Sequence, residues 1–307
     1  MKLEGIHHIT AITGDAQANV DFYAGMLGLR MVKKTVNQDA PSVYHLFYAD
    51  EQGSPGSDIT FFEFRGAPRG RAGAGMVHRI VWRVGSAEAI DFWAERLAGA
   101  GVETDREGDS LRFADPEGLE HELVVASVGD QPLIADHPEI PGELALQGFH
   151  AARAYSGDPE RSAGLLQTLE FERQGDGWEA RGESRGGLWA YDEPPAEPGR
   201  EGAGTVHHIA WASQMDEHTD WRERALAAGA RATPVIDRFW FRSIYFREPS
   251  GVLFEVATLG PGFGVDEDPE RLGEELILPP FLEDQREQIE AALTPVVNPR
   301  TAARSSS

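Results

Sequence analysis

The chain has 307 residues, enough for two hydrophobic cores, and its 41% hydrophobic and 26% charged residues are typical of a globular protein. Its 51 acidic residues outnumber 28 Lys and Arg, and the formal charge of −23 disfavours nucleic acid and anionic membranes as partners. Cysteine is absent, no apolar run approaches about 18 residues and no signal-peptide pattern opens the chain, so we expect a cytoplasmic protein without disulfides.

The first predicted unit opens with an apolar strand that contains two adjacent histidines, GIHHITAI at residues 5–12. Asp15 can cap a helix that runs to about residue 26, and Gly28 can end it. Alternating strands follow, and SDITFFEF at 57–64 closes the unit.

Three later segments repeat this order. Their histidine-containing first strands are MVHRIVWRV (76–84), GFHAARAY (148–155) and TVHHIAWA (205–212). The helices that follow begin near Ser86, Asp158 and Asp216. The closing strands lie in FADPEGLEHELVV (113–125), GGLWAYDE (186–193) and FREPSGVLFEVAT (246–258). The chain therefore contains four β-α-β-β-β repeats.

The repeats divide the chain into two halves. Repeats one and two occupy residues 3–126, and repeats three and four occupy 144–259. A Pro-rich segment, 127–143, links them, and 260–307 form a C-terminal extension with one predicted helix near 283–293. A single unit curls but cannot close, so we expect an α+β fold in which the repeats pair into two incomplete eight-stranded barrels.

Comparison of the four repeats separates two kinds of histidine. The first histidine position is occupied in every repeat, by His7, His78, His150 and His207. The next position reads His8, Arg79, Ala151 and His208. A histidine present only in repeats one and four indicates a role that only those repeats have. Because successive side chains of a strand point to opposite faces, we expect one histidine of each pair to face a shared cavity.

The closing strand of repeat four adds a carboxylate. Glu255 lies between Phe254 and Val256, and its counterparts in the sequence are Glu122 and Glu63. A buried carboxylate is unfavourable unless it is paired or bound to a metal. Glu122 has Arg79 as its expected partner. For His8, His208 and Glu255 we predict a metal site, and two histidines with one carboxylate suit Fe2+, with Mn2+ as the alternative.

The repeat pattern over about residues 3–260 resembles the vicinal oxygen chelate superfamily, which includes glyoxalases, extradiol dioxygenases and bleomycin-resistance proteins. Three longer stretches resemble its ring-cleaving dioxygenases of the hydroquinone 1,2-dioxygenase type. They are VKKTVNQDAPSVYHLFYADEQGSPGSDITFF (32–62), TPVIDRFWFRSIYFREPSGVLFEVATLGPGF (233–263) and LILPPFLEDQREQIEAAL (276–293). The resemblance implies an iron site built by repeats one and four and held by His8, His208 and Glu255. It also implies a small aromatic diphenol and O2 as substrates.

Four further residues are implied to act beside the iron: Arg238, Tyr245, His7 and His207. Arg238 could stabilise negative charge on a ring oxygen, and Tyr245 or a histidine could move the phenolic proton. Trp240 is bulkier than the aromatic residue of the resembled group at this position, which predicts a narrower pocket.

Two alternatives stay open on the sequence. A glyoxalase-type isomerase or lyase would use Glu63 as a fourth ligand, and a sequestering protein would bind a small molecule without a metal. The sequence does not determine whether the chain forms homo-oligomers, or whether its acidic composition reflects a high-salt environment.

Overall fold

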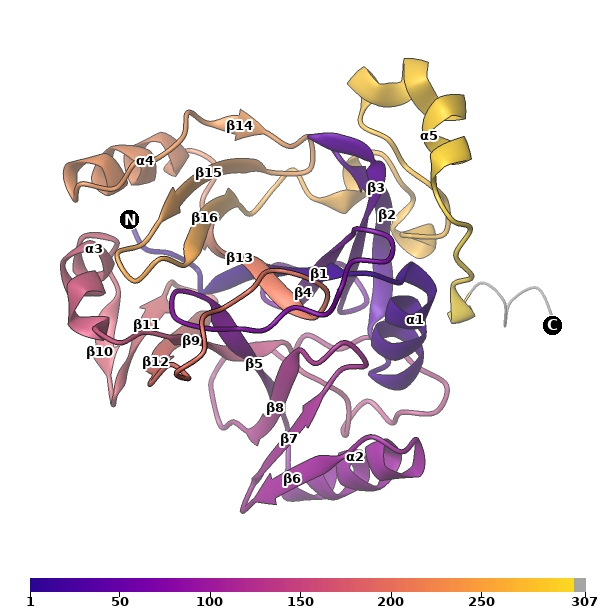
Figure 1. Ribbon diagram of the computed structural model, residues 1–307, viewed down its shortest axis with the longest axis horizontal. Coiled ribbons are helices and arrows are strands. Elements are labelled where there is room, and N and C mark those ends of the chain that lie inside the picture. The colour runs from indigo at the N-terminus through magenta and orange to yellow at the C-terminus, as the bar shows by residue number, and fades with distance from the viewer. Residues whose placement is uncertain (301–307) are drawn as a thin grey trace.

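The computed structural model describes residues 1–300, and within them the chain forms two eight-stranded sheets (Figure 1). The first sheet has the strand order β14 (Ile236–Asp237), β15 (Arg242–Arg247), β16 (Leu253–Thr258), β13 (Thr205–Ser213), β1 (Ile6–Thr13), β4 (Asp58–Glu63), β3 (Ala40–Ala49), β2 (Arg30–Asn37). The second has the order β10 (Glu172–Gln174), β11 (Gly177–Arg181), β12 (Gly186–Asp192), β9 (Phe149–Tyr155), β5 (Val77–Val84), β8 (Glu120–Val125), β7 (Ser110–Ala114), β6 (Thr104–Glu107).

Each repeat consists of one strand, one helical segment and three further strands, as predicted. The repeat helices are α1 (Ala16–Val20), which continues as a π-helix over Asp21–Met26, α2 (Ala87–Gly99), α3 (Ala163–Thr168) and α4 (His218–Ala227). These helices lie around the outside of the sheets (Figure 1). The predicted α+β fold of four repeats in two incomplete barrels is confirmed.

Two of the expected helix caps form. The side chain of Asp15 accepts a hydrogen bond from the backbone of Ala18, and Ser86 caps α2 through the backbone of Ala89. Asp158 makes no such side-chain bond, because the third helix opens as a 3-10 turn over Pro159–Ser162 rather than as a regular α-helical turn.

The first and last repeats share one sheet, and the two middle repeats share the other. Antiparallel pairing of β1 with β13 joins repeats one and four, and pairing of β5 with β9 joins repeats two and three. Aromatic contacts connect the two sheets: the ring of Trp189 in the second sheet lies 5.1 Å from Phe254 and 6.2 Å from Trp211 in the first. The first strands of two repeats thus lie together at the centre of each sheet.

Both central strand pairs contain β-bulges at the first histidine of each repeat. The register of β1 against β13 shifts at His7 and at His207, and that of β5 against β9 shifts at His78 and at His150. A bulged residue leaves the regular ladder, bends its strand and changes the direction of nearby side chains. This shared position gives all four histidines one structural feature in common.

The C-terminal segment packs against the first sheet. Lys33 on β2 is fully buried, and its Nζ lies 2.8 Å from Asp266 and also contacts Glu267. The predicted last helix is present as α5 (Arg286–Ala292), which lies near β3 (Figure 1). None of the helices within residues 1–300 is long and apolar enough to span a membrane.

Candidate metal centre

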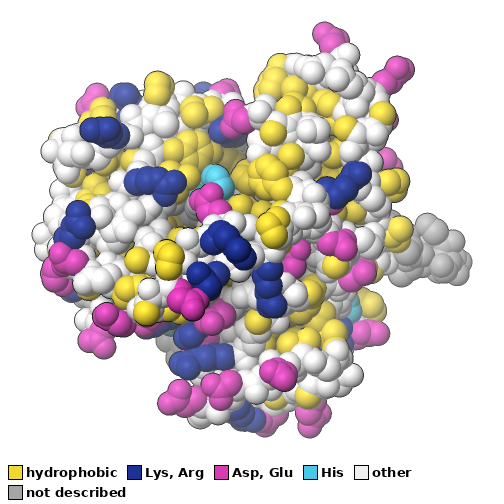
Figure 2. Space-filling view, viewed as in Figure 1, with side chains coloured by type: hydrophobic (Ala, Val, Ile, Leu, Met, Phe, Trp, Pro, Cys, Tyr) yellow, Lys and Arg dark blue, Asp and Glu magenta, His cyan; other side chains and the backbone are white. Residues whose placement is uncertain are grey.

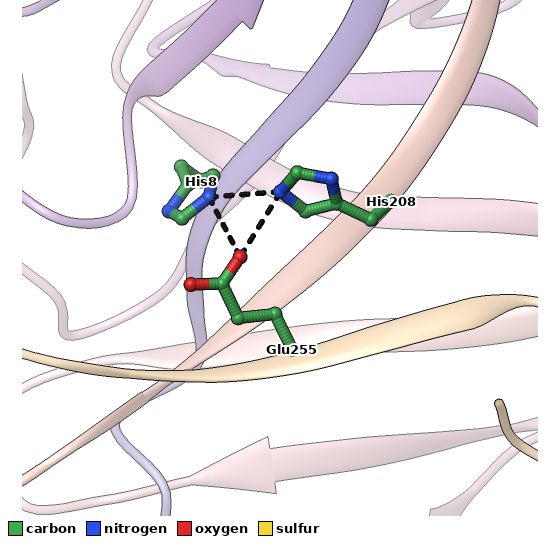
Figure 3. Close-up of side chains that lie close together, drawn as sticks. All are labelled: His8, His208 and Glu255. Carbon is green, nitrogen blue, oxygen red and sulfur yellow. Dashed lines mark hydrogen bonds and ion pairs between the residues drawn. The ribbon is translucent and has the colours of Figure 1, made fainter. Parts of the chain in front are cut away.

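Three neighbouring strands of the first sheet bring His8, His208 and Glu255 together (Figure 3). His8 lies on β1, His208 on β13 and Glu255 on β16, and all three side chains are buried. The Nε2 atoms of the two histidines are 3.2 Å apart, and Oε2 of Glu255 lies 3.3 Å from His8 Nε2 and 3.0 Å from His208 Nε2. Side chains separated by two hundred residues in the chain thus point at one small volume.

The donor atoms fit a divalent cation. A spacing of about 3 Å is what three adjacent corners of an octahedron have when each bond to the metal is about 2.1 Å long. Glu255 is fully buried, and neither carboxylate oxygen has a hydrogen-bond partner among the described residues. Burial alone would raise the pKa of Glu255, but His8 and His208 hold it well below its ordinary value. Within residues 1–300 neither a lysine nor an arginine pairs with Glu255, so the site offers one carboxylate and two imidazoles to a cation.

Hydrogen bonds of His7 define which nitrogen of His8 is available. Nε2 of His7 lies 3.1 Å from the carbonyl oxygen of Thr258, which can only accept, so Nε2 carries the proton. Burial, followed by the neighbouring His8, lowers the pKa of His7 to about 3, so the ring is neutral and its Nδ1 accepts. Nδ1 of His8 lies 2.9 Å away and donates to it. The lone pair of His8 is thereby left on Nε2, the atom that faces Glu255.

The second pair repeats this contact. Nδ1 of His207 lies 2.8 Å from Nδ1 of His208. Burial lowers the pKa of His208 to about 4, which leaves its ring neutral and able to act as a ligand. Of each pair only the second histidine, His8 or His208, lines the pocket. The bulges at His7 and His207 accompany a direct contact between the two rings of each pair.

Arg238 and Tyr245 lie next to the three donors. Tyr245 on β15 is directly opposite Glu255 in the β15–β16 ladder, and its ring is 5.7 Å from that of His208. Burial, followed by the charge of Glu255, raises the pKa of Tyr245, so the phenol stays protonated. The guanidinium of Arg238 is 5.6 Å from the Tyr245 ring centre and 2.9 Å from Asp39.

A pocket opens over the three donors. Its aromatic walls are Phe47, Phe62, Trp240, Phe241 and Tyr245, and its polar lining consists of His8, His208, Asn37, Gln38, Asp39, His45 and Arg238. On the face shown in Figure 2 a histidine is visible in a hollow bordered by hydrophobic side chains. Trp240 borders the pocket, as its bulk suggested, and Asp266 holds its indole nitrogen at 3.0 Å. Comparison of the repeats did not single out His45 or Asp39, which also line the pocket.

Comparisons with known proteins agree with this arrangement. The family described as Glyoxalase/Bleomycin resistance protein/Dioxygenase superfamily matches residues 5–123. The chain is 43% identical to the "Putative ring-cleaving dioxygenase MhqO" of Bacillus subtilis (strain 168), over 96% of this chain and 97% of that protein. It is 34% identical to the "Chlorohydroquinone/hydroquinone 1,2-dioxygenase" of Sphingobium indicum, over 94% of this chain and 95% of that protein.

A solved structure of a "putative dioxygenase" from Bacillus subtilis superimposes with a TM-score of 0.88 at 40% identity, covering 97% of this chain and 98% of that one. The chain belongs to the Glyoxalase/Bleomycin resistance protein/Dioxygenase superfamily. The resemblance inferred from the repeats and from the longer motifs is confirmed.

In the glyoxalase-type alternative, Glu63 would be a fourth metal ligand. Glu63 instead lies opposite Thr13 and Tyr44, and its carboxylate accepts a hydrogen bond of 3.2 Å from the backbone of Ala16, at the start of α1. It is not part of the His8, His208 and Glu255 cluster. Glu63 also does not line the pocket over the three donors.

The ladder position of Glu255 belongs to Thr60 in repeat one. Glu255 lies opposite Ala210, two residues after His208, and Thr60 lies opposite Thr10, two residues after His8. The sequence comparison was therefore out of register by three residues. Thr60 donates to or accepts from Thr10 at 2.8 Å, and a hydroxyl so engaged is a poor substitute for a carboxylate ligand.

Glu122 occupies the same ladder position in repeat two, opposite Val81. Nη1 of Arg79 lies 3.3 Å from its carboxylate, and the Ser110 hydroxyl donates to it at 2.6 Å. The expected internal ion pair is confirmed. The second sheet thus satisfies its carboxylate within the protein.

Proposed function

We propose that the protein is an Fe2+-dependent dioxygenase that opens the ring of a diphenol with O2. The observation that carries the proposal is a buried set of three donors, without a fourth, at the base of a pocket with aromatic walls. The names of its relatives, which include a hydroquinone 1,2-dioxygenase, support the reaction class. Mn2+ is the alternative ion for the same donors.

In this proposal His8, His208 and Glu255 hold the metal on one face and leave the opposite face for ligands. Bound Fe2+ would supply the one-electron chemistry that couples a diphenol to O2. His7 orients the His8 ring through the contact between their Nδ1 atoms, and the Thr258 carbonyl fixes His7 in turn. Such supporting hydrogen bonds set the direction and basicity of a ligand.

Arg238 and Tyr245 act on the substrate oxygens. The guanidinium of Arg238 stabilises negative charge that develops on a ring oxygen, and the field inside a desolvated pocket strengthens this effect. Tyr245 keeps its proton and can donate a hydrogen bond to the same oxygen. Burial lowers the pKa of His207, so its neutral ring can accept the phenolic proton. Phe62 and Phe241 flank the ring and exclude water from it.

Oxygen uptake by protein loaded with Fe2+ tests the proposal. We expect one O2 to be consumed per hydroquinone or catechol, both oxygen atoms to enter the ring-opened product, and no external reductant to be required. Isotopically labelled O2 with mass spectrometry follows the atoms. Conversion of a glutathione hemithioacetal without O2 uptake, together with no reaction of the diphenols, would instead place the protein among the glyoxalases.

A further inference from the structure

One wall of the pocket carries a histidine that lies outside the group of three donors. His45 on β3 borders the pocket, with its ring centre 4.0 Å from that of Phe47 and 4.4 Å from that of Phe62. Its Nε2 lies 2.8 Å from the hydroxyl of Thr60, which lies 2.8 Å from the hydroxyl of Thr10. Two aromatic neighbours and one hydrogen bond therefore hold the ring in place.

The other nitrogen of this ring is left for a ligand. Nδ1 of His45 has no hydrogen-bond partner within residues 1–300. Burial, followed by the neighbouring His8 and His208, lowers its pKa well below the ordinary value. The ring is therefore neutral, and its free nitrogen is a hydrogen-bonding group rather than a cation.

Strand register places His45 beyond the metal donors along the pocket. His208 lies opposite Thr10, and Thr10 lies opposite Thr60. His45 lies opposite Phe62, two residues further along β4 than Thr60. Two residues advance a strand by about 7 Å. From this position the His45 side chain reaches back to the Thr60 hydroxyl, so that its ring lines the same pocket as His8 and His208.

We propose that His45 is a positioning and specificity residue whose Nδ1 hydrogen-bonds the second hydroxyl of the diphenol. This inference rests on the proposed function and adds to it the side chain that would bind the second hydroxyl of a hydroquinone. A phenolic hydroxyl both donates and accepts, so either tautomer of His45 can bind it. A catechol has its two hydroxyls adjacent and cannot reach the metal and His45 together.

The test compares hydroquinone with phenol, which lacks only the second hydroxyl. Dissociation constants are measured by calorimetry without O2 on the Fe2+-loaded protein, so that no turnover occurs. We expect wild type to bind hydroquinone about tenfold more tightly than phenol, the value of one buried hydrogen bond. Because both ligands use the same metal, changes in metal affinity cancel in this ratio.

Two substitutions distinguish the roles of the two ring nitrogens of His45. The amide of H45N lies near the position of Nδ1, and the amide of H45Q lies near that of Nε2. We expect H45N to keep most of the preference for hydroquinone and H45Q, which can still reach Thr60, to lose it. If His45 only packs against its neighbours, H45Q should retain the preference for hydroquinone at least as well as H45N. Alternatively, both substitutions should change the affinities for hydroquinone and phenol by the same factor.

Equal affinity of wild type for the two ligands, or an unchanged preference in H45Q, overturns the role of His45. The proposed function survives that result if the same protein still consumes O2 with diphenols. Failure of the Fe2+-loaded protein to bind either ligand overturns both proposals.

Discussion

Where the first sheet places His8 beside Glu255, the second sheet places Arg79 beside Glu122. Arg79 and the Ser110 hydroxyl satisfy the carboxylate of Glu122 within the protein. Glu255 has two imidazoles beside it, those of His8 and His208, and neither a lysine nor an arginine pairs with it among the residues described. Arginine at one of these two histidine positions and alanine (Ala151) at the other thus separate a closed ion pair from a set of donors that a cation can complete.

The bulged histidines show the same contrast. His78 in the second sheet donates to or accepts from Asp192 at 2.7 Å and stacks on Tyr155 at 3.9 Å. His7 occupies the same position in the first sheet but contacts His8 and the Thr258 carbonyl. The bulge places a histidine at the same position in both sheets. The residues around it determine whether the histidine contacts a structural partner, as His78 does, or a candidate metal ligand, as His7 does.

The largest expected difference between the sheets comes from their carboxylates. Glu255→Gln should lose most bound iron and nearly all turnover while remaining folded, because it removes the only charged donor of the three. The matched change Glu122→Gln should leave iron content unchanged. Iron analysis after gel filtration, with circular dichroism to verify folding, measures both. Equal iron loss in the two variants would contradict a site confined to repeats one and four.

The next effect separates the arginines of the two sheets. Arg238→Gln should lower kcat/KM by about 100- to 1,000-fold, the usual loss on removal of one donor to a developing oxyanion, while iron content stays normal. Arg153, which pairs with Asp192 in the second sheet, supplies the control: Arg153→Gln should leave kcat/KM close to wild type. Normal turnover of the Arg238 variant would assign this arginine to a structural role with Asp39.

A smaller effect distinguishes the bulged histidines. His7→Phe removes the acceptor that fixes the His8 ring, and loss of such support typically weakens metal affinity by about 10- to 100-fold. His78→Phe retains an aromatic ring against Tyr155 and should not change metal affinity. Competition with a metal chelator measures the two dissociation constants. If both variants bind metal as wild type does, the contact between His7 and His8 does not orient the ligand.

The smallest expected effect is that of Glu63→Gln. Burial raises the pKa of Glu63, so the folded protein disfavours its charged form and should tolerate a neutral amide. We expect iron content and turnover to stay unchanged and the free energy of unfolding to shift by less than about 1 kcal/mol. Denaturant unfolding and iron analysis test this. Loss of iron would restore Glu63 as a fourth ligand and favour the glyoxalase alternative.

The sequence by itself determined the four repeats and the selection of candidate ligands. Hydrophobic periodicity and helix caps repeat in every unit, and histidine at the second position occurs only in repeats one and four. Comparison within one chain therefore singled out His8, His208 and Glu255, which the structure brings within about 3 Å of one another. Metal binding by these three residues stays a prediction.

Only the tertiary structure decided the direction of the histidines and the register of the carboxylates. Alternation along a strand predicted one histidine of each pair in the pocket, and His8 and His208 line it. The contact of His7 with His8 and of His207 with His208 was not predicted, because the bulges at His7 and His207 depend on pairing between strands two hundred residues apart. Pairing of β1 with β4 places Thr60, not Glu63, at the ladder position of Glu255. Pairing of β3 with β4 places His45 on the pocket wall, where comparison of the repeats did not find it. Local sequence encodes the period of a strand, whereas the partner strand determines which residues face the site.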